Sequence, residues 1–190
     1  MTKLQIENIP KELKSIDQWV RWEDMEDKKP IDPKFQSNQF ASSTDPHTWG
    51  KFKQALSYCN GVGGIGFVFT SNDPYAGIDL DNCRDRRTGT INREAMLIAR
   101  RLNSYTEISP SGKGLHILVK CKPFKGRRGK LIEAYYYGQY LTVTGQHYEP
   151  TPYKIEYRDR ELRDLIKVYF PSKRIKAMAR EGIILKSLWG

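Results

Sequence analysis

The chain has 190 residues, a length that fits one domain or two small subdomains with a shared core. Apolar residues make up 38% of the sequence, and the longest apolar runs are far too short to cross a bilayer, which excludes a membrane-spanning protein. Lysine and arginine number 32 against 22 aspartates and glutamates, so the net charge of +10 favours a polyanionic partner, above all nucleic acid.

The N-terminus and the cysteines indicate a cellular compartment. The first residues contain no apolar segment of the kind found in a secretory signal. Cys59, Cys83 and Cys121 are far apart and form no CxxC pair, which argues against a zinc finger. We therefore expect a protein of the reducing cytoplasm.

In the first half of the chain, alternating and helical apolar patterns are separated by turns rich in proline and glycine. They predict a short helix over 10–16, a strand over 18–22, a long loop over 23–43, a helix over 46–59, and strands over 65–70 and 77–80. The helix over 46–59 is indicated by a capping residue before Pro46 and by apolar side chains that recur every three or four residues.

The second half continues the mixture of helices and strands. It predicts a helix over 91–102, an extended segment over 105–108, strands over 115–119, 131–135 and 140–144, and helices over 160–170 and 172–188. Gly138 is a candidate hairpin turn between two of these strands. Because hairpins occur beside crossovers, the sequence predicts an α/β fold of the mixed α+β kind, with a sheet that is not purely parallel.

Two carboxylates, Asp79 and Asp81, are separated by one apolar residue at the end of the strand predicted over 77–80. Residues two apart on a strand point to the same face, so the two side chains lie together. Neighbouring carboxylates repel each other unless a cation lies between them, and hard oxygen ligands select Mg²⁺ or Mn²⁺. Such pairs also occur at solvated strand ends, so both interpretations stay open on this motif alone.

A turn rich in serine and glycine precedes the strand predicted over 115–119. Its residues include Ser109, Ser111, Gly112, Lys113 and Gly114, and His116 follows within the strand. The backbone N–H groups and hydroxyls of such a turn can bind phosphate oxygens, and the histidine ring can donate to a phosphate as well. The order of residues is not that of a Walker motif. A flexible loop beside a buried, hydrogen-bonded histidine is the alternative.

Glu133 lies alone on the apolar strand predicted over 131–135, where burial of an acid without a partner is costly. If it faced Asp79 and Asp81, the three acids would form a site for two metal ions, of the kind that catalyses phosphoryl and nucleotidyl transfer. A solvent-facing position is the alternative. The segment over 120–130 before it contains six basic residues and no acid, which near a metal site predicts contacts with a phosphate backbone; a solvated loop is the alternative.

These three motifs, in this order, resemble the archaeo-eukaryotic primase superfamily, and in particular the primase–polymerase domain of phage and plasmid replication proteins. The acidic strand over 78–81, the turn over 111–116 and Glu133 match the three motifs of that family. The flanks that also match include 18–20, 41–46, 64–68, 105–110 and 142–145. The likeness covers about residues 8–146.

The resemblance implies an RRM-like catalytic subdomain over about 71–155, packed on an N-terminal α/β subdomain over about 1–70. The active site would lie in the cleft between them, and the primase–polymerase domain would end near residue 170. Residues 171–190 would form a C-terminal helix that begins a truncated helical accessory module.

The resemblance also implies roles for individual residues. Asp79, Asp81 and Glu133 would hold Mg²⁺ or Mn²⁺, and His116 would complete the catalytic set. The triphosphate of the nucleotide would be bound by Ser109, Ser111, Gly112, Lys113, Gly114 and His116, with Lys29 as a further contact. The basic residues Lys125, Arg127, Arg128 and Lys130 would bind nucleic acid.

The implied reaction is template-directed attack of a 3′-OH on the α-phosphate of a dNTP or NTP, with release of pyrophosphate. The implied partners are a single-stranded DNA template, a primer, and a helicase, fused or separate. The setting would be the cytoplasm of a bacterial, archaeal or phage-infected cell.

Two other functions fit part of the pattern. A metal-dependent nuclease could use the same three acids together with Lys113 or Lys130, although it has no need of the serine- and glycine-rich turn. A catalytically inactive module could bind single-stranded nucleic acid through the basic segment and through base stacking on Tyr135, Tyr136 and Tyr137.

Overall fold

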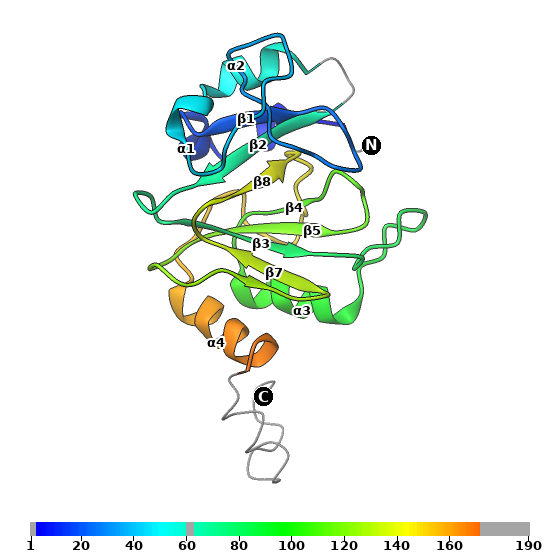
Figure 1. Cartoon of the computed structure of the whole chain (residues 1–190). Helices are drawn as coiled ribbons and strands as arrows, with labels where there is room; N and C mark the ends of the chain where they lie inside the picture. Colours follow the sequence, from blue (N-terminus) through cyan, green and yellow to red (C-terminus); the bar gives the residue numbers. More distant parts are fainter. Residues whose placement is uncertain (1–2, 60–62, 172–190) are drawn as a thin grey trace, which may run out of the picture.

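The computed structural model describes residues 3–59 and 63–171 and contains two β-sheets, each covered by helices on its outer side (Figure 1). Every pairing between its named strands is antiparallel. The predicted mixed fold with a sheet that is not purely parallel is therefore confirmed. The helix predicted over 172–188 lies outside the described residues.

The smaller sheet has the strand order β1-β2-β8. Its strands are β1 (Trp19–Trp22), β2 (Gly64–Phe69) and β8 (Gln139–Val143). The helical segments near it are η1 (Ile6–Asn8), α1 (Lys11–Lys14), η2 (Pro46–Thr48) and α2 (Phe52–Ser57). Its core is aromatic: the ring of Trp19 lies 4.8 Å from that of Phe52 and 5.3 Å from that of Phe67, in both cases edge to face.

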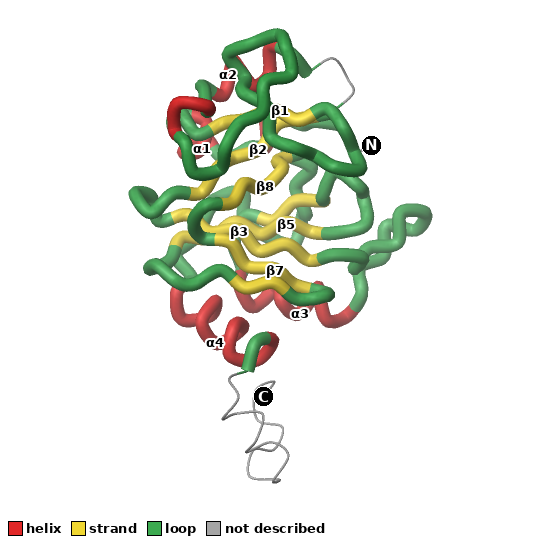
Figure 2. Tube along the Cα trace, in the orientation of Figure 1, coloured by secondary structure: helices red, strands yellow, loops and turns green. Residues whose placement is uncertain are grey.

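The larger sheet has the strand order β4-β5-β3-β7-β6. Its strands are β3 (Tyr75–Leu80), β4 (Thr106–Ile108), β5 (Leu115–Lys120), β6 (Arg127–Arg128) and β7 (Ile132–Tyr135). Two amphipathic helices, α3 (Arg93–Leu102) and α4 (Asp159–Tyr169), cover the face turned away from the smaller sheet (Figure 2). These elements agree with the predicted ones to within a few residues, except β6, which the sequence did not predict.

Strand β3 explains how the two faces of the larger sheet are used. Ala76, Ile78 and Leu80 are buried in the core beneath α3 and α4. Tyr75 is buried on the opposite face, in the core shared with the smaller sheet. A Cβ atom on Gly77 would lie 2.7 Å from the ring of Phe69, so the sheets approach closely there. The next residue on that face is Asp79.

The helix predicted over 46–59 is wrong as one element. It is divided into η2 and α2 because Gly50 pairs with Trp19 as a strand would, through N–H···O bonds of 3.0 and 2.9 Å. A Cβ atom at Gly50 would lie 2.7 Å from the Pro33 side chain. A long-range backbone pairing therefore overrides the helical periodicity of this segment.

The hairpin predicted around Gly138 is also wrong. Strand β7 pairs with β3 and β6, whereas β8 pairs with β2, so the chain crosses from one sheet to the other at this glycine. Gly138 has φ +67°, and its carbonyl accepts a hydrogen bond of 2.8 Å from the Ser43 hydroxyl. The turn residue was identified correctly, but its partners are remote in sequence.

The division of the chain at about residue 70 stays a prediction; β8, from the second half, lies in the smaller sheet. Within the part of the chain that the structure describes, no helix has both the length and the apolar character needed to span a membrane.

Candidate active site

One row of polar side chains runs across all the strands of the larger sheet. In antiparallel register, Glu107 on β4 pairs with His116 on β5, His116 with Asp79 on β3, Asp79 with Glu133 on β7, and Glu133 with Arg128 on β6. Directly opposed residues point to the same face, so these five side chains share one face of the sheet. This face is opposite to the one covered by α3 and α4.

Asp79 is central in the row and largely buried. Burial raises the pKa of its carboxyl group, His116 opposes that shift, and the nearby carboxylates of Asp81 and Glu133 raise it further. Asp81 and Glu133 are thus close enough to Asp79 for their charges to act on its pKa. Asp81 itself is exposed just beyond the end of β3, where its backbone N–H donates to Leu131.

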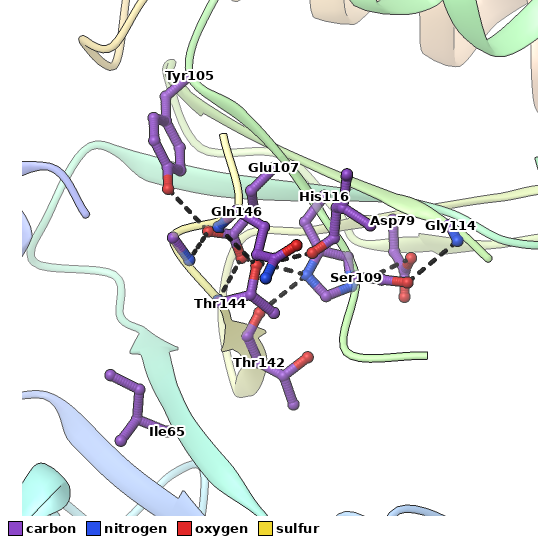
Figure 3. Close-up of polar contacts among 12 residues, drawn as sticks. Ile65, Asp79, Tyr105, Glu107, Ser109, Gly114, His116, Thr142, Thr144 and Gln146 are labelled. Carbon is purple, nitrogen blue, oxygen red and sulfur yellow. Dashed lines mark hydrogen bonds and ion pairs between the residues drawn. The ribbon is translucent and has the colours of Figure 1, made fainter. Parts of the chain in front are cut away.

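His116 is buried and is held from both sides of its ring (Figure 3). Its Nδ1 lies 2.8 Å from the carbonyl oxygen of Thr142 on β8, and because a carbonyl only accepts, Nδ1 carries a proton. Its Nε2 lies 3.5 Å from an Asp79 carboxylate oxygen. Burial opposes charging of the ring, but the carboxylates of Asp79 and Glu107 outweigh it and raise the pKa of His116.

Sequence reasoning did not identify Glu107 as a site residue. Its carboxylate is 1% exposed and accepts hydrogen bonds of 2.8 Å from the Tyr105 hydroxyl and from the backbone N–H groups of Thr144 and Gly145. One of its oxygens lies 3.7 Å from Nδ1 of His116. The signal that identified Glu133, a lone acid on an apolar strand, also applies to Glu107.

The predicted phosphate turn is compact and internally bonded. The Ser109 hydroxyl accepts from the Gly114 N–H at 3.1 Å and lies 3.0 Å from the Ser111 hydroxyl. A Cβ atom on Gly114 would lie 2.6 Å from the carbonyl oxygen of Leu80, so only glycine allows the turn to pack against the end of β3. The turn therefore lies directly beside the acidic end of that strand. Gly112 has φ +73°, and Lys113 is exposed.

The two lysines near the loop over 23–43 are placed differently. Lys29, the predicted nucleotide contact, is exposed, forms an ion pair of 2.6 Å with Asp27, and has its pKa raised by that partner. Lys28, which the sequence did not single out, instead lowers the pKa of Asp79. The Lys28 backbone has φ +43°, and its carbonyl oxygen accepts a hydrogen bond from the Tyr140 hydroxyl.

The predicted nucleic-acid contacts lie on and around β6, at the edge of the larger sheet. Arg128 is exposed and ends the polar row, with its Nε 3.9 Å from a Glu133 carboxylate oxygen and a guanidinium nitrogen 2.7 Å from the Gln139 side-chain oxygen. The other predicted contacts, Lys125, Arg127 and Lys130, are exposed as well.

The acids have the chemistry of ligands for a divalent cation. Carboxylate oxygens are the donors that Mg²⁺ and Mn²⁺ prefer, and the strand register brings Asp79 and Glu133 side by side. Burial first, and then the carboxylates of Asp81 and Glu133, raise the pKa of Asp79, and a cation at these acids would oppose that shift. Among the described residues, however, no three side chains are already arranged as a metal-binding group. Glu133 instead accepts a hydrogen bond from the Tyr135 hydroxyl.

A comparison with curated proteins found a relative described as a DNA primase-polymerase, from Nitratiruptor phage NrS-1. The two sequences are 38% identical over 149 residues, which cover 73% of this chain and 20% of the relative. The chain thus spans about one fifth of the length of that protein. No family model matches the chain.

Proposed function

We propose, from the premise that this chain contains a phage-type primase–polymerase domain, that it transfers nucleotides to a 3′-OH on a single-stranded DNA template. The observation that carries the proposal is the polar row across the larger sheet. It places Asp79 between Glu133 and His116, at the end of β3 against which the serine- and glycine-rich turn packs. Acids and a phosphate-binding turn in this proximity suit chemistry at a nucleoside triphosphate.

Asp79, Asp81 and Glu133 would hold Mg²⁺ or Mn²⁺. When bound, the metal would supply positive charge to the triphosphate and lower the pKa of the attacking hydroxyl. The acids contribute by concentrating negative charge on one face, opposite to an apolar core that keeps β3 fixed. The position of Asp79 is set by strand pairing on both sides of β3, so it does not depend on a loop.

His116 would act on the triphosphate through Nε2, because Nδ1 is committed to the Thr142 carbonyl oxygen. Its raised pKa supports a protonated ring that can donate from Nε2 to an anionic oxygen. Ser109, Ser111 and the backbone from Gly112 to Gly114 would bind the phosphates next to it, and Lys113 would add a positive charge. Lys125, Arg127, Arg128 and Lys130 would bind the nucleic acid.

The finer architecture belongs to the same proposal. The larger sheet with α3 and α4 would be the RRM-like catalytic subdomain, and the smaller sheet with its helices the N-terminal subdomain. The bond from His116 to Thr142 supports a site between them, since it joins a strand of each sheet. A helicase and a helical accessory module as partners, and a cytoplasmic setting, are proposed on the same premise.

The test is nucleotide incorporation on single-stranded DNA, with and without a primer. Reactions contain Mg²⁺ or Mn²⁺ and either dNTPs or NTPs, and they compare the wild type with Asp79→Asn. Asp17→Asn is the matched control, because it makes the same chemical change in an exposed turn before β1, outside the polar row. We expect Asp79→Asn to lose incorporation, Asp17→Asn to retain it, and both variants to fold.

The other outcomes identify the alternatives. Shortening of the template without synthesis would indicate a metal-dependent nuclease. Binding of DNA without synthesis or cleavage would indicate an inactive binding module. Incorporation by Asp79→Asn at the wild-type rate would remove Asp79 from the catalytic set and overturn the proposal.

A further inference from the structure

The connection between β3 and α3 beyond Asp81, residues 82–92, has no role in the site described above. Figure 1 shows it projecting from the end of the larger sheet, in green at the right of the view. The connection is an ordered small hairpin. Arg84 forms a bridge with Ile91, and the N–H of Asp85 donates to Thr90 at 2.9 Å. The Asp85 carboxylate accepts hydrogen bonds from the N–H groups of Arg87 and Thr88, at 2.7 and 3.1 Å.

A positively charged hollow of about 760 Å³ lies against this hairpin. Arg84, Arg86, Arg87 and Lys113 line it, with Asp85 as the acid among them. Within residues 3–59 and 63–171, none of these four cations forms an ion pair, whereas Arg101 and Arg163 pair with acids of α4. Four cations against one carboxylate leave the hollow with an excess of positive charge that a polyanion can neutralise.

The hairpin is fixed to the phosphate turn. The N–H of Arg84 donates to the Lys113 carbonyl oxygen at 2.8 Å, and its guanidinium donates to the Gly112 carbonyl oxygen at 2.9 Å. The β6–β7 connection reaches the same end of the sheet, because the N–H of Asp81 donates to Leu131. The acids therefore lie between two basic regions: the hairpin on one side and the predicted strip over 125–130 on the other.

We propose that the hairpin, through Arg86 and Arg87 with Arg84 and Lys113 at its base, binds the phosphate backbone of the single-stranded nucleic acid. The inference rests on the proposed function and adds a second binding surface to it. A nucleotide seated on the turn over 109–114 could reach Arg84 and Lys113, but the exposed arginines between Asp85 and Gly89 lie beyond them, toward the tip. A strand of successive phosphates accounts for cations along the whole hairpin.

The test is equilibrium binding of a fluorescently labelled oligo-dT to the full chain, measured by anisotropy over a range of KCl concentrations. The test variant is Arg86→Gln/Arg87→Gln. The matched control is Arg100→Gln/Arg160→Gln, which removes two exposed arginines from the helices behind the sheet. A third variant, Arg86→Lys/Arg87→Lys, keeps the charge. Thermal unfolding followed by circular dichroism shows that each variant is folded.

We expect the test variant to bind oligo-dT about tenfold more weakly at low salt. The slope of log K against log[KCl] should fall by about 0.7 for each lost phosphate contact. The control should behave as the wild type, and the lysine variant should recover most of the affinity. In primed incorporation at saturating DNA, the KM for the dNTP should not change.

Two results overturn the inference while the proposed function stands. The first is that the wild type binds and extends DNA, and the test variant binds oligo-dT with the same affinity and the same salt slope as the wild type. The other is a raised dNTP KM at unchanged DNA affinity, which would assign the hairpin to the triphosphate. A wild type that neither binds DNA nor incorporates nucleotides would refute both the inference and the proposed function.

Discussion

Replacement of Glu107 by glutamine tests the most deeply buried member of the polar row. One carboxylate oxygen accepts from the Tyr105 hydroxyl and the Gly145 N–H, and the other accepts from the Thr144 N–H and faces Nδ1 of His116. Glutamine has the same shape but one oxygen and one NH₂ group. In either orientation, the NH₂ group faces a backbone N–H, so at least one buried donor loses its acceptor.

The structure sets the size of this effect. A buried donor without an acceptor costs about 1–3 kcal/mol of folding free energy. For a chain of this length, each kcal/mol lowers the melting temperature by roughly 2–4 °C. We therefore expect Glu107→Gln to melt about 2–12 °C below the wild type, and Glu107→Ala to melt lower still, because it leaves all three donors unpaired and creates a cavity.

The same substitution should change catalysis through His116. Burial disfavours the charged ring, and Glu107 is one of the carboxylates that offset this penalty, so its loss lowers the pKa of His116. If the charged ring binds the triphosphate, the alkaline limb of the incorporation rate moves to lower pH.

The assay is thermal unfolding by circular dichroism, followed by a pH profile of primed incorporation at a temperature where both proteins are folded. Glu26→Gln, in an exposed loop, is the control and should match the wild type in both measurements. A Glu107→Gln variant with the melting temperature of the wild type would refute the hydrogen-bond argument. An unchanged pH profile would show that Glu107 does not act through His116.

Three further predictions follow from the site. Gly114→Ala should raise the nucleotide KM and lower the free energy of unfolding by about 1–3 kcal/mol, because the new Cβ atom would lie 2.6 Å from the Leu80 carbonyl oxygen. The control is Gly126→Ala, where the nearest contact of the Cβ atom is at 3.3 Å. Lys28 lowers the pKa of Asp79, which burial raises, so Lys28→Gln should raise that pKa and move the acid limb of the pH–rate profile to higher pH. Lys29→Gln, which removes a lysine paired with Asp27, should leave the acid limb in place. Mg²⁺ should raise the melting temperature of the wild type but not of Asp79→Asn, and an equal rise in both would refute the metal assignment.

The sequence predicted local structure well because short-range patterns determine it. The apolar runs of β2 and β5 and the helical periodicity of α3 located these elements to within a few residues. The errors arise where remote backbone pairs with the segment. Gly50 interrupts a helical pattern because Trp19 binds it, and β8 leaves the neighbouring β7 because β2 binds it. No local propensity encodes either partner.

In the candidate site, too, local sequence predicted the kinds of residue but not their contacts. The types of residue in the three motifs indicated an anion- and cation-binding site, but their contact depends on register. Asp79 and Glu133 are more than fifty positions apart, and only the antiparallel pairing of β3 with β7 makes them neighbours. Lys28 and Lys29 look equivalent in a sequence, and only the structure shows that the charge of Lys28 lowers the pKa of Asp79 whereas Lys29 pairs with Asp27. The turn with φ +43° at Lys28 distinguishes them.

The two faces of β3 explain why the chain can hold acids in its interior. On one face, the apolar side chains of Ala76, Ile78 and Leu80 pack under α3 and α4, which fixes the strand. On the other face, Tyr75 and Gly77 pack against the smaller sheet, and Asp79 follows where that apolar contact gives way to His116 and Glu133. The packing of the whole opposite face of β3 thus offsets the energetic cost of the largely buried Asp79 carboxylate. The acids therefore carry their charge on a rigid strand. A site that places reacting oxygens accurately requires such rigidity.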